Sequence, residues 1–347
     1  MANIAESLKN KVSGTTGEGP PLDHHEAKSN KGISIIIRGF LLLVVLVFAG
    51  IGLYVSREPD LFEIPKESDI TGYATTATLV KVADIMLHKP GGFMSNDVVP
   101  PFIFLDNMPS WEYGVLVQIR DLSRRMRQDM ARSLSQSKED PDLAVAEPFF
   151  SLGEDQWIFP ASEEEYGKGM IALERFQRRL IDPSQPTAQF YARADNLQNW
   201  LQDVGTRLGS LSQRLSASVE TRRINTDLSG DAEARQSTPS FREVAVKTSW
   251  YEIDDIFYES RGTTWALLHF LKAIEIDFHD ILLKKNALTS MQQIVMELES
   301  SQSTMMSPII LNGQGFGVFA NHSLVMANYI SRANAAIIDL RLLLQQG

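Results

Sequence analysis

The chain has 347 residues, of which 44% are hydrophobic and 22% are charged, a composition typical of globular proteins. It contains no cysteine, which excludes disulfide scaffolds, thiolate zinc sites, iron–sulfur clusters and cysteine nucleophiles. The 43 acidic residues outnumber the 33 lysines and arginines, and the formal net charge is -10. Because no basic block is present, we expect no nucleic-acid partner.

Residues 1–32 are polar and contain glycine and proline, so they predict a disordered tail. Residues 33–55 predict a transmembrane helix. The run from Gly39 to Val55 carries no charged residue. As a helix it covers about 25 Å, slightly less than a hydrocarbon core of about 30 Å. Arg38 interrupts the apolar sequence before this run, and its side chain can reach the headgroups.

The charges on either side of the predicted span indicate its orientation. Lys28, Lys31 and Arg38 precede it, whereas the basic residues that follow it are diluted by acidic ones. Basic flanks stay in the cytoplasm, so we expect an inner-membrane protein with a cytoplasmic N terminus and a periplasmic bulk. The alternative is a signal peptide cleaved at Gly50 or Gly52. The long segment before the apolar run favours an uncleaved anchor.

Residues 56–69 predict a charged linker, and residues 70–347 predict an exported helical domain. Long proline-free stretches with apolar residues at steps of three and four predict long helices. The candidates are 74–88, 111–135, 141–147, 162–180, 187–219, 249–285 with a continuation over 287–300, and the segment after Asn321.

Local signals refine these helices. Ser162 and Glu165 form a capping box, and Asn321 is expected to cap the last helix. Gly262 marks a point where the helix at 249–285 is expected to break. The polar segment 229–240 predicts a flexible loop between an N-terminal and a C-terminal helical half.

Strand-like alternation is confined to the short runs at 102–105 and 308–311. We therefore predict an all-α class, with one N-terminal transmembrane helix followed by a multi-helix periplasmic bundle.

The segment 249–285 carries the densest group of titratable residues. They lie at helical spacing and offer a face that could bind a divalent metal or support catalysis. A di-iron bundle needs two Glu-x-x-His motifs, and these are absent. We expect solvated or ion-paired side chains and assign no catalytic, metal or cofactor-binding residue. The residues are Glu252, Asp255, Glu259, His269, Glu275, Asp277, His279 and Asp280.

The glycine run at 313–317 lacks the Lys-Ser/Thr of a phosphate-binding loop, so we expect a turn. Arg120, Arg124 and Arg127 share one face of the helix at 111–135. They could hold anionic headgroups or an acidic partner, or they could pair within the helix.

The segment 91–111 is apolar although its prolines prevent a regular helix. Phe93, Phe102, Phe104 and Trp111 must be covered by the bundle, by a partner or by the membrane surface. We expect the three phenylalanines to cover a groove near the membrane and part of this surface to receive a partner.

Several segments resemble an uncharacterised family of Gram-negative bacteria, the domain of unknown function 2333. They are Tyr73–Val80, Lys89–Pro101, Asp106–Gly114 and Phe190–Leu197. The resemblance extends from the anchor to the C terminus. It implies an inner-membrane-anchored architecture, and it implies no activity, cofactor or catalytic residue.

The function that these features favour is a structural or interaction module of the cell envelope, with an envelope protein as partner. The alternative is an envelope enzyme that acts on cell wall or lipid through the carboxylates of 249–285. A ligand-sensing receptor is disfavoured by the short cytoplasmic tail, and association of copies stays open.

Overall fold

The computed structural model describes residues 31–134, 136–184, 187–224, 243–307, 309–314 and 317–346. The chain divides into two compact units, Met1–Ala49 and Gly50–Gly347. The boundary lies inside helix α2, Lys31–Val55. Within α2, Ser34–Val55 is long and apolar enough to cross a membrane, and its side chains are mostly exposed. It is the one such helix among the described residues.

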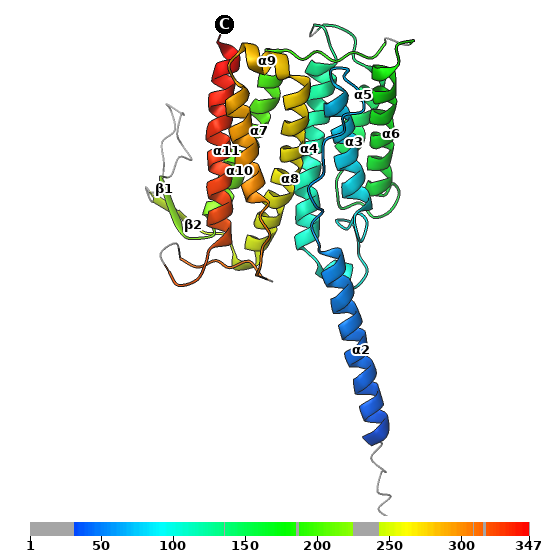
Figure 1. Ribbon diagram of the computed structural model, residues 1–347. Coiled ribbons are helices and arrows are strands. Elements are labelled where there is room, and N and C mark those ends of the chain that lie inside the picture. Colours follow the sequence, from blue (N-terminus) through cyan, green and yellow to red (C-terminus); the bar gives the residue numbers. More distant parts are fainter. Residues whose placement is uncertain are drawn as a thin grey trace, which may run out of the picture. The chain divides into compact units, whose positions relative to one another are not determined.

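The unit from Gly50 onward is a bundle of antiparallel helices that stand side by side (Figure 1). Successive long helices run in alternate directions, because each is followed by a loop that reverses the chain. The described residues are predominantly helical, which confirms the predicted all-α class. The helices are α3 (Tyr73–His88), α4 (Asn107–Arg125), α5 (Pro141–Phe150), α6 (Ser162–Ile181), α7 (Ala194–Ser216), α8 (Ile253–Asp277), α9 (His279–Lys284), α10 (Leu288–Ser301) and α11 (His322–Gln345).

Smaller elements connect the long helices. Phe102–Phe104 and Trp250–Glu252 are short 3-10 helices, and Met126–Met130 continues α4 as a π-helical turn. The strands β1 (Thr221–Ile224) and β2 (Glu243–Val246) pair antiparallel, with Thr221 opposite Val246. This hairpin was not expected, because four-residue strands are too short to show alternation.

Some predicted boundaries were wrong. Ser162 does not cap α6: Ala161 holds that position, and the Ser162 hydroxyl donates to Gly153 O at 2.7 Å. Helix α7 begins at Ala194 rather than near residue 187. The preceding residues are extended, and Tyr191 N donates to Met130 O at 2.7 Å.

Another prediction was confirmed, and others concern segments outside the described residues. The Asn321 cap is confirmed, since its side chain accepts a hydrogen bond from Leu324 N at 2.8 Å. Residues 1–30 of the expected tail and the expected flexible loop at 229–240 lie outside the described residues. Two residues of the glycine run at 313–317 also lie outside the described residues. Gly313, the first residue of that run, donates from its backbone N–H to Ala320 O at 2.9 Å.

Helix α8 is continuous through Gly262, so the predicted break there was wrong. The glycine is needed for packing: a Cβ atom at Gly262 would lie 2.0 Å from Trp111 O in α4. A Cβ atom at Gly114 would likewise lie 2.1 Å from Glu259 O. The backbones of α4 and α8 therefore touch, and the chain turns instead at Phe278, between α8 and α9.

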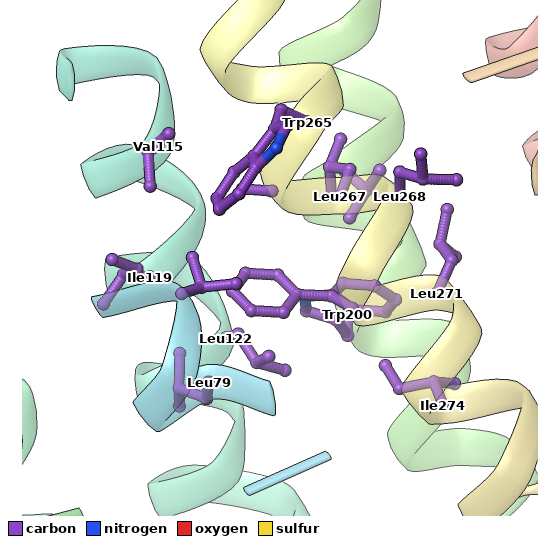
Figure 2. Close-up of a cluster of buried hydrophobic side chains, with 14 of the residues drawn as sticks. Leu79, Val115, Ile119, Leu122, Trp200, Trp265, Leu267, Leu268, Leu271 and Ile274 are labelled. Carbon is purple, nitrogen blue, oxygen red and sulfur yellow. The ribbon is translucent and has the colours of Figure 1, made fainter. Parts of the chain in front are cut away.

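The core forms around this contact. The Trp111 and Trp265 rings have their centroids 5.2 Å apart. Figure 2 shows side chains from α3, α4, α7 and α8 meeting in one cluster, which continues through the bundle. The labelled members are Leu79, Val115, Ile119, Leu122, Trp200, Trp265, Leu267, Leu268, Leu271 and Ile274.

Residues 57–72, which we call the strap, have no regular helix or strand and lie along α8. Two turns into α8, Arg261 donates to the Glu58 carboxylate at 3.0 Å and to Ser301 O at 2.7 Å. At its end, Asp277 accepts from Gly72 N at 2.8 Å and from Thr75 N at 2.7 Å. The strap therefore runs from Arg261 to the C-terminal end of α8 before α3 begins.

The middle of the strap is held by Phe62. Its ring stacks on His269 with centroids 3.9 Å apart, and the Lys81 ammonium lies 4.3 Å from its centroid. Phe62 N donates to His269 Nε2 at 3.1 Å, while His269 Nδ1 lies 2.7 Å from Trp265 O. These contacts require a neutral imidazole with its proton on Nδ1.

Replacing Gly262 by alanine should destabilise the bundle, because the added methyl group must separate α4 from α8. We expect the free energy of unfolding to fall by about 1–3 kcal/mol. Gly167→Ala is the matched control, because no atom lies within 4 Å of its Cβ position. That variant should be stabilised by about 0.5–1 kcal/mol. Thermal unfolding of full-length protein in detergent measures both. Equal stability of the two variants would contradict the close approach.

Stability should depend on the protonation of His269. Burial is the main cause that lowers the pKa of His269 to about 4; the charges of Lys272 and Lys81 act in the same direction, and the hydrogen bond to Trp265 O opposes them. An unfolded histidine titrates near 6.5. The unfolded state thus binds more protons between these values, so stability is complete above pH 6.5 and falls toward pH 4. The loss amounts to about 3 kcal/mol. His269→Gln should lose this pH dependence, as chemical unfolding at pH 7.5 and 4.5 would show. An unchanged difference between these pH values would contradict the assignment.

Candidate interaction surface

The connection between α3 and α4 is anchored on a buried carboxylate. Glu112 of α4 is fully buried, and the Lys89 ammonium pairs with it. It also accepts from Met94 N at 2.9 Å and from Ser95 N at 2.8 Å. Burial raises the pKa of Glu112, and the charge of Lys89 opposes that rise. This carboxylate fixes the first half of the connection against α4.

Gly91 turns the chain with a φ of +94°, a conformation that favours glycine. A Cβ atom there would lie 3.0 Å from Val55 Cβ. Val55 is only 4% exposed and belongs to the core cluster of the bundle unit. The last residue of α2 is therefore packed against the α3–α4 connection.

The candidate aromatic residues of this segment have different environments. Phe93 is buried and meets the Tyr166 ring edge-on at a centroid distance of 5.5 Å, and Trp111 is buried against Trp265. Phe102 is half-buried and packs on the core. Phe104 is 77% exposed. Of the four, Phe104 is therefore the one whose ring is available to a partner.

The three candidate arginines hold helices together. Arg120 donates to Phe150 O and Leu152 O, each at 2.5 Å, and so fixes the end of α5. Arg124 binds Asp121 within its own helix at 2.8 Å and Asp203 of α7 at 3.2 Å. Arg127 pairs with Glu147 of α5 at 3.0 Å. These guanidinium groups are engaged inside the domain.

The titratable residues of the 249–285 segment are spread along α8 and beyond, and several have structural partners. Glu259 pairs with Arg214 of α7 at 2.6 Å, Asp255 accepts from Ser110 at 3.0 Å, and Asp277 caps α3. His269 is in the core. In the part of the chain that the structure describes, no group of three His, Asp or Glu side chains is placed to hold a metal ion.

Four connections gather at one end of the bundle, opposite α9 and the C terminus (Figure 1). They are the α3–α4 connection, the α5–α6 connection, the residues before α8, and the α10–α11 connection. Asn96 Nδ2 of the α3–α4 connection donates to Gln156 O of the α5–α6 connection at 2.8 Å, and Arg261 of α8 donates to Ser303 O of the α10–α11 connection at 3.0 Å. Val55 packs at this same end through the α3–α4 connection.

We call this surface the apolar end, because large apolar side chains project from all four connections. Phe159 is 93% exposed and Val318 is 98% exposed, so these side chains stand out from the surface. The members are Val98, Val99, Ile103, Phe104, Trp157, Ile158, Phe159, Trp250, Tyr251, Met306, Ile309, Val318 and Phe319.

Sequence reasoning found the first connection and missed the other three. The missed members are short clusters such as Trp157-Ile158-Phe159, which precedes Pro160, and Val318-Phe319, which follows Gly317. Two or three adjacent large apolar residues beside a proline or glycine are the signal that could have found them, because no helix there can bury them.

A search of curated proteins and a search of solved structures each found no match. The family model of DUF2333, described as an uncharacterized protein conserved in bacteria, matches residues 28–347, nearly the whole chain. The match begins just before the apolar helix and includes the whole bundle. The chain therefore belongs to the DUF2333 family.

Proposed function

We propose that this protein is a single-pass inner-membrane protein whose helical domain lies in the periplasm and acts as a structural or interaction module of the cell envelope. The apolar end carries the proposal. Exposed large apolar side chains from four connections lie at this one end of the bundle, and an accumulation of this kind marks an interaction site. We infer that another component of the envelope covers it.

The way in which charged residues are used supports binding over catalysis. A catalytic site needs several titratable groups that converge in one cleft. On α8, Glu259, Asp255 and Asp277 instead hold three different helices: α7, α4 and α3. The arginines that could have held an anionic substrate connect α4 to α5 and α7.

The junction between α2 and the bundle supports a role close to the membrane. Val55 is packed in the bundle unit, and the strap that follows is bonded along α8. A long free linker would let a domain range away from its anchor. Here the domain begins where the candidate span ends, which suits a module that works at the membrane surface.

The orientation can be tested with reporter fusions after Gly347. Because basic residues precede the span and acidic residues dilute those that follow, we expect alkaline phosphatase fused there to be active. A green fluorescent protein fused at the same position should stay dark. The opposite pair of results would place the domain in the cytoplasm.

The apolar end can be tested by photo-crosslinking. We expect p-benzoylphenylalanine at position 104 of the full-length protein to form an adduct with an envelope component in intact cells. Leu134 is the control position, because it is 69% exposed but lies in the connection at the opposite end. Equal adduct formation at both positions, or none at position 104, would refute the assigned surface.

Serine variants distinguish the exposed surface from the core, and thermal unfolding of the full-length protein measures the difference. Phe104→Ser should keep the thermal stability of the parent protein, because its ring is exposed. Phe93→Ser should lose about 3–5 kcal/mol, because its ring is buried against Tyr166.

A further inference from the structure

We propose that the apolar end docks on the lipid bilayer itself, with its projecting side chains inserted among the headgroups of the membrane that α2 spans. This inference rests on the proposed function and names the partner of the same surface as phospholipid.

Chain connectivity places this surface at the membrane. The candidate span ends at Val55, and Val55 is packed against Gly91 of the α3–α4 connection. The Leu105 side chain, at the other end of that connection, would lie 3.6 Å from a Cβ atom at Gly52. The connection therefore borders the last turn of the span, where hydrocarbon gives way to headgroups. Phe104 lies beside Leu105 and is exposed at that level.

The kinds of residue at the apolar end suit this location. Trp and Tyr concentrate at the boundary between membrane and water, where an apolar ring and a polar group are both accommodated. Trp157, Trp250 and Tyr251 are each more than half exposed on this surface, and Phe159 and Phe319 project beside them. Interfacial anchors of peripheral proteins combine such aromatic residues with aliphatic ones.

The uneven shape of the apolar end favours lipid over a folded protein as its partner. A protein interface has a packed centre of complementary shape. Here the apolar groups are separate tips on four connections, with exposures from 47% at Val98 to 98% at Val318. Lipid can close around separate tips without a matching shape.

Carboxylates near the apolar end disfavour electrostatic attraction to anionic lipid, so we expect its binding to the membrane to depend on its apolar side chains. Asp106, Asp254 and Asp255 lie near one another at the starts of α4 and α8, and each adds negative charge. These carboxylates repel anionic headgroups, so docking should not require anionic lipid. This distinguishes it from the binding of a basic patch to a charged membrane.

The chain has no cysteine, so single cysteines can carry nitroxide labels without other changes. Full-length Phe104→Cys, Phe159→Cys and Phe319→Cys would be labelled and reconstituted in phosphatidylcholine vesicles. Leu134→Cys and Leu283→Cys are controls, exposed at the opposite end of the bundle. Collision with oxygen, which concentrates in lipid, is compared with collision with a water-soluble nickel complex.

We expect the ratio of oxygen to nickel collisions to be several-fold higher at the three positions of the apolar end than at the controls. Adding phosphatidylglycerol should not raise it. Nickel accessibility equal to that of the controls would show a surface in water and overturn the inference. Shielding from both reagents would show a protein partner or a second copy instead, and would also overturn it.

The unmodified protein gives a second measurement if a label disturbs folding. Of its five tryptophans, Trp111, Trp200 and Trp265 are buried, whereas Trp157 and Trp250 are exposed at the apolar end. Brominated lipid should quench the fluorescence of the exposed pair, and Trp157→Phe with Trp250→Phe should remove that quenching. Unquenched tryptophan would overturn the inference. Neither measurement depends on which side of the cell membrane the domain occupies. A negative result would therefore overturn lipid docking without deciding the outcome of the fusion and crosslinking tests of the proposed function.

Discussion

The contact between the backbones of α4 and α8 is the constraint on which the rest of the bundle depends. Gly114 and Gly262 remove the two Cβ atoms that would separate the helices. The close approach brings Trp111 against Trp265 and buries most of α8. Because α8 lies in the interior, its polar residues need partners, and Arg261, His269 and Asp277 find them in the strap and at the start of α3.

The strap follows from that burial. A helix interior with a buried guanidinium, a neutral imidazole and a carboxylate would be costly without hydrogen bonds. Glu58 neutralises the guanidinium, Phe62 N donates to the imidazole, and Gly72 N and Thr75 donate to the carboxylate. A segment whose charge and prolines predict a linker is in this way bonded along the domain.

The sequence predicted what depends on local pattern. The spacing of apolar residues predicts helices because the residues that form the buried face of a helix are close together in sequence. Asn321 predicts a helix cap because its hydrogen-bond partner is three residues away. The predicted helix break at Gly262 was wrong because the glycine serves a tertiary contact. A Cβ atom there would collide with Trp111 O, which is distant in sequence. Ser162 was misjudged for the same reason, since it serves Gly153 O in the preceding loop rather than its own helix.

The candidate surface shows the same limit. The apolar connection at 91–111 stands out alone, but nothing in a single sequence says that it meets the connections that carry Trp157, Trp250 and Phe319. For the arginines of α4 the sequence suggests pairing within the helix, as Arg124 makes with Asp121, but not the carbonyl groups and carboxylates of α5 and α7 that also bind them. Contacts between residues distant in sequence decide which side chains are engaged inside the domain and which remain exposed to a partner.

The strap also sets an order of assembly. Glu58 meets Arg261 across a separation of 203 residues, and Phe62 meets His269 across 207. At a synthesis rate of about 5–20 residues per second, α8 follows the strap by roughly 10–40 s. The strap, the first segment after α2, is therefore synthesised long before the helix that holds it exists. The bundle therefore cannot fold in the order of its sequence from α2 onward, and the residues of the strap are among the last to reach their final contacts.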